Sequence, residues 1–326
     1  MTFEGRVRRT KGVFLVLLGA VPVHLFLFGW SQLPQLNLHA FNSRLEERIE
    51  LRGKMFDRER RPLALSAGTR RVYPQGELAA HWTGYHHSQR GMGGGERWKH
   101  ELLRDRRVDG GREVLAGREV RFSLDVLRQQ RLASHFPGTR GAALLVELTS
   151  GQILGGLSLP SYSPARAGAE WHRWQQDPAA PLLNRCTLGL YPADLLARAF
   201  GDRLGAIRQR PPALMDWTRP LTVEDNRILL SPAQVGAAIL SLGTSLRLSQ
   251  IYSEHRQPWS GLSAVRQRLI WVESPRGRSW AAVESLRSQS VTWALALKGD
   301  HLVVLVVEQA LPLDKARATA LLMVQD

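Results

Sequence analysis

The apolar positions of this chain form one long uninterrupted run, followed by many short periodic segments. Residues 13–30 contain no Asp, Glu, Lys or Arg, and a helix of that length spans roughly 27 Å, about the thickness of a bilayer core. Basic residues precede the run and favour the cytoplasmic side. The pattern predicts a cytoplasmic tail over 1–12 and a transmembrane helix over 13–30. A cleaved signal peptide is the alternative, but the run is long for one and no clear A-x-A site follows.

Shorter patterns predict the next elements. Residues 31–50 have the polar and apolar faces of an amphipathic stalk. Apolar positions over 52–66 alternate around a charged turn, which indicates a hairpin. Residues 120–124 alternate like a half-buried strand, and Asp125 is placed to cap a helix that reaches about Phe136. Residues 31–117 are therefore predicted as stalk and pedestal, with 105–117 as a charged, glycine-bearing linker, and residues 118–326 as a second domain.

The second domain is predicted to contain two hairpins with helices between and after them. Apolar strands over 141–148 and 153–159 flank a short turn. A Tyr191-Pro192 turn leads into a helix, and Ser231 precedes Pro232 as the N-cap of a further helix over about 230–242. Strands over 291–297 and 301–307 and a helix over 313–323 close the chain. This order predicts an α+β fold, with an antiparallel sheet and a helical cluster.

Composition excludes some classes of function. The formal charge is +15, and 39 of the 44 basic residues are arginine. A surface for anionic polymers or headgroups is one interpretation, and arginine-biased composition is the one we favour. The basic residues are scattered and form no known nucleic-acid motif, which argues against nucleic-acid binding. Cys186 is the only cysteine, so no intrachain disulfide forms, and a small buried residue is the expected role of this thiol.

Three local features invite a cofactor or acid–base interpretation that their spacing does not support. The glycines of 91–95 lack the lysine of a phosphate loop and are expected to form a flexible turn. Glu96 and Glu101 stand five apart and do not share a helix face. Four histidines lack carboxylate or cysteine partners at a metal-binding spacing and are expected to be solvated loop residues. We therefore predict neither a metal nor a cofactor. The histidines are His81, His86, His87 and His100.

Longer spaced motifs are more specific than this periodicity. Residues 52–66 read R-G-K-M-F-D-R-E-R-R-P-L-A-L-S, residues 72–85 read V-Y-P-Q-G-E-L-A-A-H-W-T-G-Y, and residues 181–192 read P-L-L-N-R-C-T-L-G-L-Y-P. Together they resemble class B penicillin-binding proteins, the monofunctional peptidoglycan transpeptidases of bacteria. The resemblance covers about 50–200 well and 230–326 in outline. It implies an N-terminal pedestal joined to a penicillin-binding transpeptidase-like module, truncated here between Arg198 and Leu230. Arg60 replaces the turn glycine of the first motif.

The catalytic motifs of that family are not found in this sequence. The serine that is acylated in the family corresponds to Leu195, and the lysine three residues on corresponds to Arg198. No S-x-x-K, S-x-N or K-T-G/K-S-G occurs anywhere in the chain. Arginine stays protonated and cannot serve as the base. The sequence predicts that the chain is not an enzyme and has no catalytic residue, and that Leu195 packs inward.

The resemblance implies a role in cell-wall synthesis. Family members work with polytopic peptidoglycan glycosyltransferases of the SEDS family, so the expected function is that of a catalytically inactive factor that scaffolds or regulates such a partner. Two alternatives remain: an active D,D-transpeptidase or carboxypeptidase with an unrecognised nucleophile, and a non-catalytic peptidoglycan binder. The expected location is the bacterial cytoplasmic membrane, with the main domain on its outer side.

Overall fold

The computed structural model of the chain describes residues 52–67, 70–105, 107–109, 112–114, 117–209, 222–287 and 289–325. The chain divides into two compact units, Met1–Arg48 and Ile49–Asp326, and the described residues belong to the second. No helix among them is long and apolar enough to cross a membrane. The predicted membrane helix and stalk, 13–30 and 31–50, lie outside the described residues.

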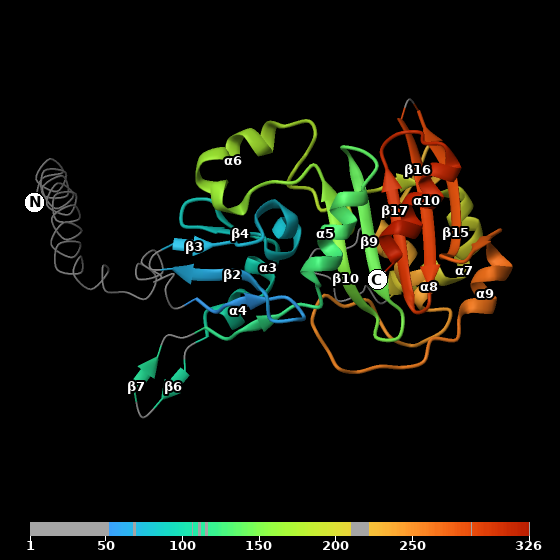
Figure 1. Ribbon diagram of the computed structural model, residues 1–326. Coiled ribbons are helices and arrows are strands. Elements are labelled where there is room, and N and C mark those ends of the chain that lie inside the picture. The colour runs from blue at the N-terminus through green and yellow to red at the C-terminus, as the bar shows by residue number, and fades with distance from the viewer. Residues whose placement is uncertain are drawn as a thin grey trace, which may run out of the picture. The chain divides into compact units, whose positions relative to one another are not determined.

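The pedestal is built on a four-stranded sheet of short strands in the order β3-β2-β1-β8 (Figure 1). The predicted hairpin is confirmed, since β1 pairs antiparallel with β2. β8 pairs parallel with β1 and places Val120 opposite Met55. The sheet thus joins the pedestal to the start of the second predicted domain. Its strands are β1 (Met55–Phe56), β2 (Pro62–Ala67), β3 (Arg70–Val72) and β8 (Val120–Arg121).

Two predictions for the rest of the pedestal were wrong. The glycines expected to form a flexible turn make strand β5 and the start of helix α3. A Cβ on Gly94 would lie 2.6 Å from the Cα of Gly84, so glycine lets two backbone segments touch there. The expected linker contains the antiparallel hairpin β6–β7. The elements are η2 (Gly76–Ala79), α2 (Ala80–Thr83), β4 (Tyr85–His87), β5 (Gly91–Gly93), α3 (Gly94–Trp98), α4 (His100–Leu103), β6 (Arg107–Asp109) and β7 (Arg112–Val114).

The second half of the fold is organised around a six-stranded antiparallel sheet with the strand order β10-β9-β17-β16-β15-β14. Both predicted hairpins, β9–β10 and β16–β17, are confirmed. A small sheet, β11-β13-β12, lies beside helix α7. The strands are β9 (Gly141–Glu147), β10 (Gln152–Leu159), β11 (Tyr191–Pro192), β12 (Thr222–Glu224), β13 (Arg227–Leu230), β14 (Val272–Ser274), β15 (Gly277–Leu286), β16 (Gln289–Lys298) and β17 (His301–Val307).

Helices cover both faces of this sheet (Figure 1). Asp125 accepts hydrogen bonds from the backbone N–H groups of Leu127 and Arg128, which confirms the predicted cap of α5. Ser231 and Gln234 form a capping box at the start of α8, as the sequence predicts for Ser231. The helices are α5 (Val126–His135), η3 (Pro164–Arg166), α6 (Ala167–Gln176), α7 (Asp194–Gln209), α8 (Pro232–Leu240), α9 (Leu262–Arg268) and α10 (Leu313–Val324).

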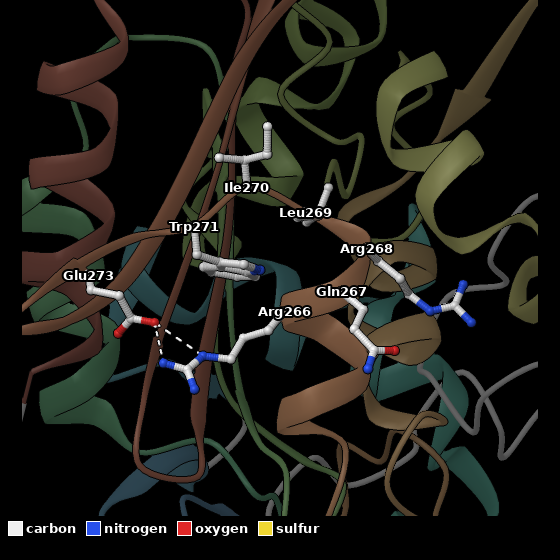
Figure 2. A pocket seen from close by; sticks show the side chains of 7 residues that line it. All are labelled: Arg266, Gln267, Arg268, Leu269, Ile270, Trp271 and Glu273. Atoms are coloured by element: carbon white, nitrogen blue, oxygen red, sulfur yellow. Dashed lines mark hydrogen bonds and ion pairs between the residues drawn. The ribbon is translucent and has the colours of Figure 1, made fainter.

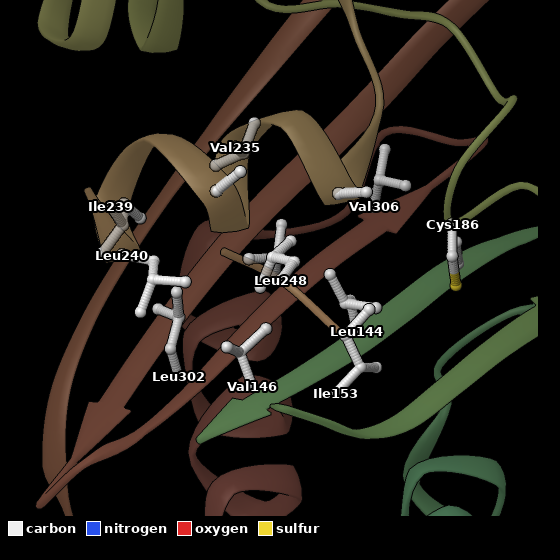
Figure 3. Close-up of a cluster of buried hydrophobic side chains, with 14 of the residues drawn as sticks. Leu144, Val146, Ile153, Cys186, Val235, Ile239, Leu240, Leu248, Leu302 and Val306 are labelled. Atoms are coloured by element: carbon white, nitrogen blue, oxygen red, sulfur yellow. The ribbon is translucent and has the colours of Figure 1, made fainter. Parts of the chain in front are cut away.

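The two faces of the sheet bury separate apolar clusters. Every residue of α8 is buried, and its side chains pack with those of β9 and β17 on one face (Figure 3). Helix α10 buries Ala316 and Ala320 on the other face. Strands β9 and β17 are apolar and buried at nearly every position, so both faces of the sheet are shielded from solvent there. The α+β architecture expected from the sequence is confirmed.

Candidate functional site at the start of helix α7

The start of α7 is the place where the resemblance puts the family's chemistry. Strand β11 ends at Pro192, and the helix begins at Asp194. The exposed fraction of Leu195 is 46%, and Arg198 is also exposed. The prediction that Leu195 packs inward was therefore wrong. Leu196 and Ala197, the next two positions, carry the buried face of this turn instead.

Three charged residues from different segments meet at this helix terminus. The backbone N–H of Leu195 donates to Oε1 of Glu284 at 2.9 Å. Arg227 forms ion pairs with both Glu284, at 2.5 Å, and Asp194. The other contact of Asp194 is with the backbone N–H of Ile228, at 2.8 Å. Carboxylates are stabilised at a helix N-terminus by its dipole and its free N–H groups, so this cluster satisfies the terminus from within the chain.

No sequence pattern pointed to Glu284 or Arg227. Glu284 lies on β15, 89 residues from Leu195, and Arg227 lies on β13. The only signal in the sequence was that Glu284 interrupts an otherwise apolar or neutral stretch of strand. The exposed fraction of the Glu284 side chain is 6%, against 32% for Arg227. A carboxylate so deeply buried requires a cationic partner, and Arg227 supplies it.

The wall behind the site is held by buried polar contacts. Trp293 Nε1 donates to the carbonyl of Pro192 at 2.8 Å. Tyr191 packs edge-on against the same indole and donates its hydroxyl to Glu308 at 3.1 Å. Burial and the charge of Glu308 raise the pKa of Tyr191 well above its usual value, while Arg185 opposes this rise. The tyrosine hydroxyl is therefore protonated and acts as a structural donor at neutral pH.

The motif residues before the turn fold the approach loop. Arg185 is buried, binds Glu308 at 2.8 Å and donates to the carbonyls of Ala179 and Ala180. Asn184 accepts a hydrogen bond from the backbone N–H of Cys186 at 3.1 Å. The thiol of Cys186 is buried and lies 3.2 Å from the carbonyl oxygen of Leu157. The expected burial of Cys186 is confirmed, and the matching residues explain the loop conformation.

The pedestal motifs meet in a buried ion cluster around Glu96. Its two carboxylate oxygens bind Arg52 at 2.6 Å and Arg71 at 2.7 Å, and all three side chains are at most 3% exposed. Burial raises the pKa of Glu96, but the charges of Arg71 and Arg52 outweigh burial, and the net pKa lies below its usual value. Glu101, the other half of the rejected acid–base pair, is exposed on α4. Glu96 is thus a structural anion.

The histidines behave only partly as expected. His81 is buried and packs edge-on against Tyr162, so its assignment as a solvated residue was wrong. Burial and the nearby charge of Arg185 lower the pKa of His81 to about 3, which keeps the imidazole neutral. Within the part of the chain that the structure describes, no group of three or more His, Cys, Asp or Glu side chains is placed to hold a metal ion.

Comparisons with known proteins agree with the fold. No protein-family profile matches the chain. Residues of this chain are 32% identical over 82 residues to the peptidoglycan D,D-transpeptidase MrdA of Escherichia coli K12, and 32% identical over 83 residues to that of Salmonella typhimurium LT2. Each match covers 24% of this chain and 13% of the relative. The matched region therefore spans about an eighth of the length of these relatives.

Solved structures match over most of the chain. Penicillin-binding protein A from Mycobacterium tuberculosis, as its ceftriaxone acyl-enzyme complex, has a TM-score of 0.68 at 16% identity, covering 86% of this chain and 98% of that one. The D,D-transpeptidase domain of a peptidoglycan glycosyltransferase from Eggerthella lenta has a TM-score of 0.63 at 16% identity, with coverages of 83% and 96%. The resemblance to class B penicillin-binding proteins is confirmed, and the chain has the fold of their transpeptidase domains.

One expectation from the sequence is contradicted. We expected, from Leu195 and Arg198, that the chain is not an enzyme. The relatives that match it in sequence are named D,D-transpeptidases, and the matching solved structures include acyl-enzyme complexes. The basis of the expectation was the residues at these two positions and the absence of the three catalytic motifs from the sequence, and these comparisons overturn it.

Proposed function

We propose that this protein acts in peptidoglycan synthesis at the outer side of the bacterial cytoplasmic membrane, where its pedestal scaffolds or regulates a polytopic glycosyltransferase of the SEDS type. The observation that carries the proposal is a folded pedestal joined to a transpeptidase fold. β1 pairs with β8, and Asp57 accepts hydrogen bonds from the turn residue Arg61 at 2.7 Å and from the first residue of α5, Val126, at 3.2 Å.

Buried polar contacts cross-link the pedestal and join it to the large sheet, which supports a role as a docking platform. In the Glu96 cluster, Arg52 and Arg71 lie 44 and 25 positions before Glu96 in the chain. Trp82 Nε1 donates to the carbonyl of Gly156 on β10 at 3.1 Å, which fixes the pedestal against the large sheet. A contact made by the pedestal would therefore be transmitted to the transpeptidase fold as a rigid-body displacement.

Pull-down of the full-length protein from detergent tests the contact. Val72 on edge strand β3 is 40% exposed and Leu102 on α4 is 38% exposed, so Val72→Asp and Leu102→Asp change the pedestal surface without touching its core. Each should reduce recovery of a polytopic glycosyltransferase, identified by mass spectrometry. The matched control is Leu127→Asp on α5, where the leucine is 57% exposed. Equal recovery by all three variants would place the contact elsewhere.

The membrane topology needs its own test. A C-terminal alkaline phosphatase fusion should be active in intact cells. A C-terminal green fluorescent reporter, exported by the same route, should be dark. The reverse result would place the described unit in the cytoplasm and remove the cell-wall proposal altogether.

Acyl transfer to a penicillin is the second candidate function. The names of the sequence relatives and the acyl-enzyme complexes among the matching structures favour it. Full-length protein incubated with a fluorescent penicillin should then show a covalent band on a gel that unlabelled benzylpenicillin removes, and peptide mapping would identify the acylated residue. Absence of a band at saturating penicillin would eliminate this candidate and leave the docking proposal intact.

A further inference from the structure

The large sheet ends in a short strand, β14, whose outer edge is not paired with any strand of the described residues. β14 pairs with β15 through Val272–Ser279, Glu273–Arg278 and Ser274–Gly277. It is the last strand in the sheet order, and among the described residues no strand pairs with its other side. Such an edge presents backbone N–H and C=O groups on which a further strand can form.

Apolar side chains are exposed along this edge. Ile270, just before β14, is 90% exposed, and Val272 is 44% exposed. Charged or twisted edges are the usual protection against strand addition. β14 is short and carries Glu273, but a β-branched residue stands almost fully in solvent beside it, so burying that residue against a partner would be favourable.

A pocket of about 330 Å³ lies beside these residues, between the end of α9 and the approach to β14 (Figure 2). Its lining includes Arg266, Arg268, Trp271 and Glu273. Trp271 Nε1 donates to the carbonyl of Val265 at 3.2 Å, so the polar edge of the indole is held by α9. The pocket therefore combines an aromatic wall with guanidinium groups.

The charge at this edge is positive. Arg266 and Arg278 share Glu273, at 2.7 and 2.8 Å, and Arg268 binds Asp202. Three arginines thus face two carboxylates, an excess of one positive charge. Both carboxylates are about half exposed, and exposed pairs of this kind are weak. Arg266, whose side chain is itself 49% exposed, can therefore turn to a carboxylate of a partner at little cost.

We propose that β14 and this pocket form the docking site for an extended segment of a partner protein in which acidic and apolar residues alternate. The segment adds to the outer edge of β14 as a further strand. One of its apolar side chains lies against Ile270 and Val272, and one of its carboxylates lies against Arg266 or Arg268. A second copy of this chain fits less well, because pairing two such edges would bring like charges together. The proposal does not depend on the pedestal contact.

The experiment uses full-length protein in detergent and two blocked, fluorescent seven-residue peptides, one alternating glutamate with valine and one alternating lysine with valine. Fluorescence anisotropy should show the acidic peptide binding at least about tenfold more tightly than the basic one. Amide hydrogen exchange of residues 272–274 should slow when the acidic peptide is bound, because added-strand hydrogen bonds protect an edge.

Matched variants separate this site from general attraction to a basic surface. Ile270→Asp and Arg266→Glu should each weaken the acidic peptide by about tenfold or more. Val223→Asp, on edge strand β12 where the valine is 61% exposed, should leave the affinity unchanged. Circular dichroism and the urea midpoint should be equal for all three variants, because the substituted side chains are exposed or partly exposed.

Several outcomes would overturn the proposal. Equal affinity for both peptides, unprotected β14 amides, or binding that survives Ile270→Asp would each refute an acidic strand at this edge. Light scattering that shows a dimer of the protein, lost in Ile270→Asp, would assign the edge to a second copy instead.

Discussion

Replacing Glu96 by glutamine removes the anion at the centre of the pedestal while keeping the shape of the side chain. The guanidinium groups of Arg52 and Arg71 are 3% and 2% exposed and would remain buried with no counter-charge. Removing one partner of a buried ion pair costs about 3–5 kcal/mol. A domain is typically stable by about 5–15 kcal/mol, so this single change should remove a large part of the folding free energy.

Urea unfolding followed by tryptophan fluorescence measures the effect, since the chain contains ten tryptophans. Glu96→Gln should lower the midpoint with little change in the slope. Asp314→Asn is the control: Asp314 pairs with Arg317 but is 97% exposed, and its loss should cost at most about 0.5 kcal/mol. A cost below about 1 kcal/mol for Glu96→Gln would show that water or other groups satisfy both arginines.

A second variant separates charge burial from lost packing. Replacing Arg52, Arg71 and Glu96 together by apolar residues of similar volume removes every buried charge of the cluster. Such replacements are often neutral or stabilising, so the triple variant should be more stable than Glu96→Gln alone. A triple variant less stable than the single one would refute the electrostatic explanation.

Four further outcomes follow from particular positions. Because the pKa of Glu96 is lowered on folding from 4.5, the stability of the native protein should fall as pH drops below about 4.5, and Glu96→Gln should weaken that dependence. The pKa of His81 is lowered to about 3, so its ring proton resonance in NMR should not shift between pH 8 and 5, and stability should decrease as pH falls from 6.5 towards 3. Arg60 has φ of 62°, and Arg60→Gly should stabilise the pedestal by about 1 kcal/mol in urea unfolding. Leu195→Ser should change stability by only about 0.5 kcal/mol because Leu195 is 46% exposed. Glu284→Ala should cost about 1–3 kcal/mol, because the backbone N–H of Leu195 loses its acceptor and Arg227 keeps, among the described residues, only Asp194.

Local features were predictable where neighbouring residues decide them. The hairpin strands β9, β10, β16 and β17 follow from apolar runs around short turns, and the structure places their ends within two residues of the predicted ones. The caps at Asp125 and Ser231 depend on contacts within three residues. The motif spacing also predicted the transpeptidase fold, because the same spaced residues build the pedestal hairpin and the approach to α7.

Tertiary structure decided what depends on distant partners. Leu195 was expected to be buried, but the first turn of α7 buries its next two residues, and only the position of β15 and β13 makes that terminus a charged site. Glu284 and Arg227 come from strands that no local pattern connects. The sequence predicts His81 as a solvent-exposed loop histidine, but in the structure Tyr162 packs against it and the side chain is buried. The sequence by itself determined the hairpin strands, the capped helices and their order, because those follow from short-range periodicity and capping. Burial, charge pairing and pKa were set only when segments far apart in the chain came into contact.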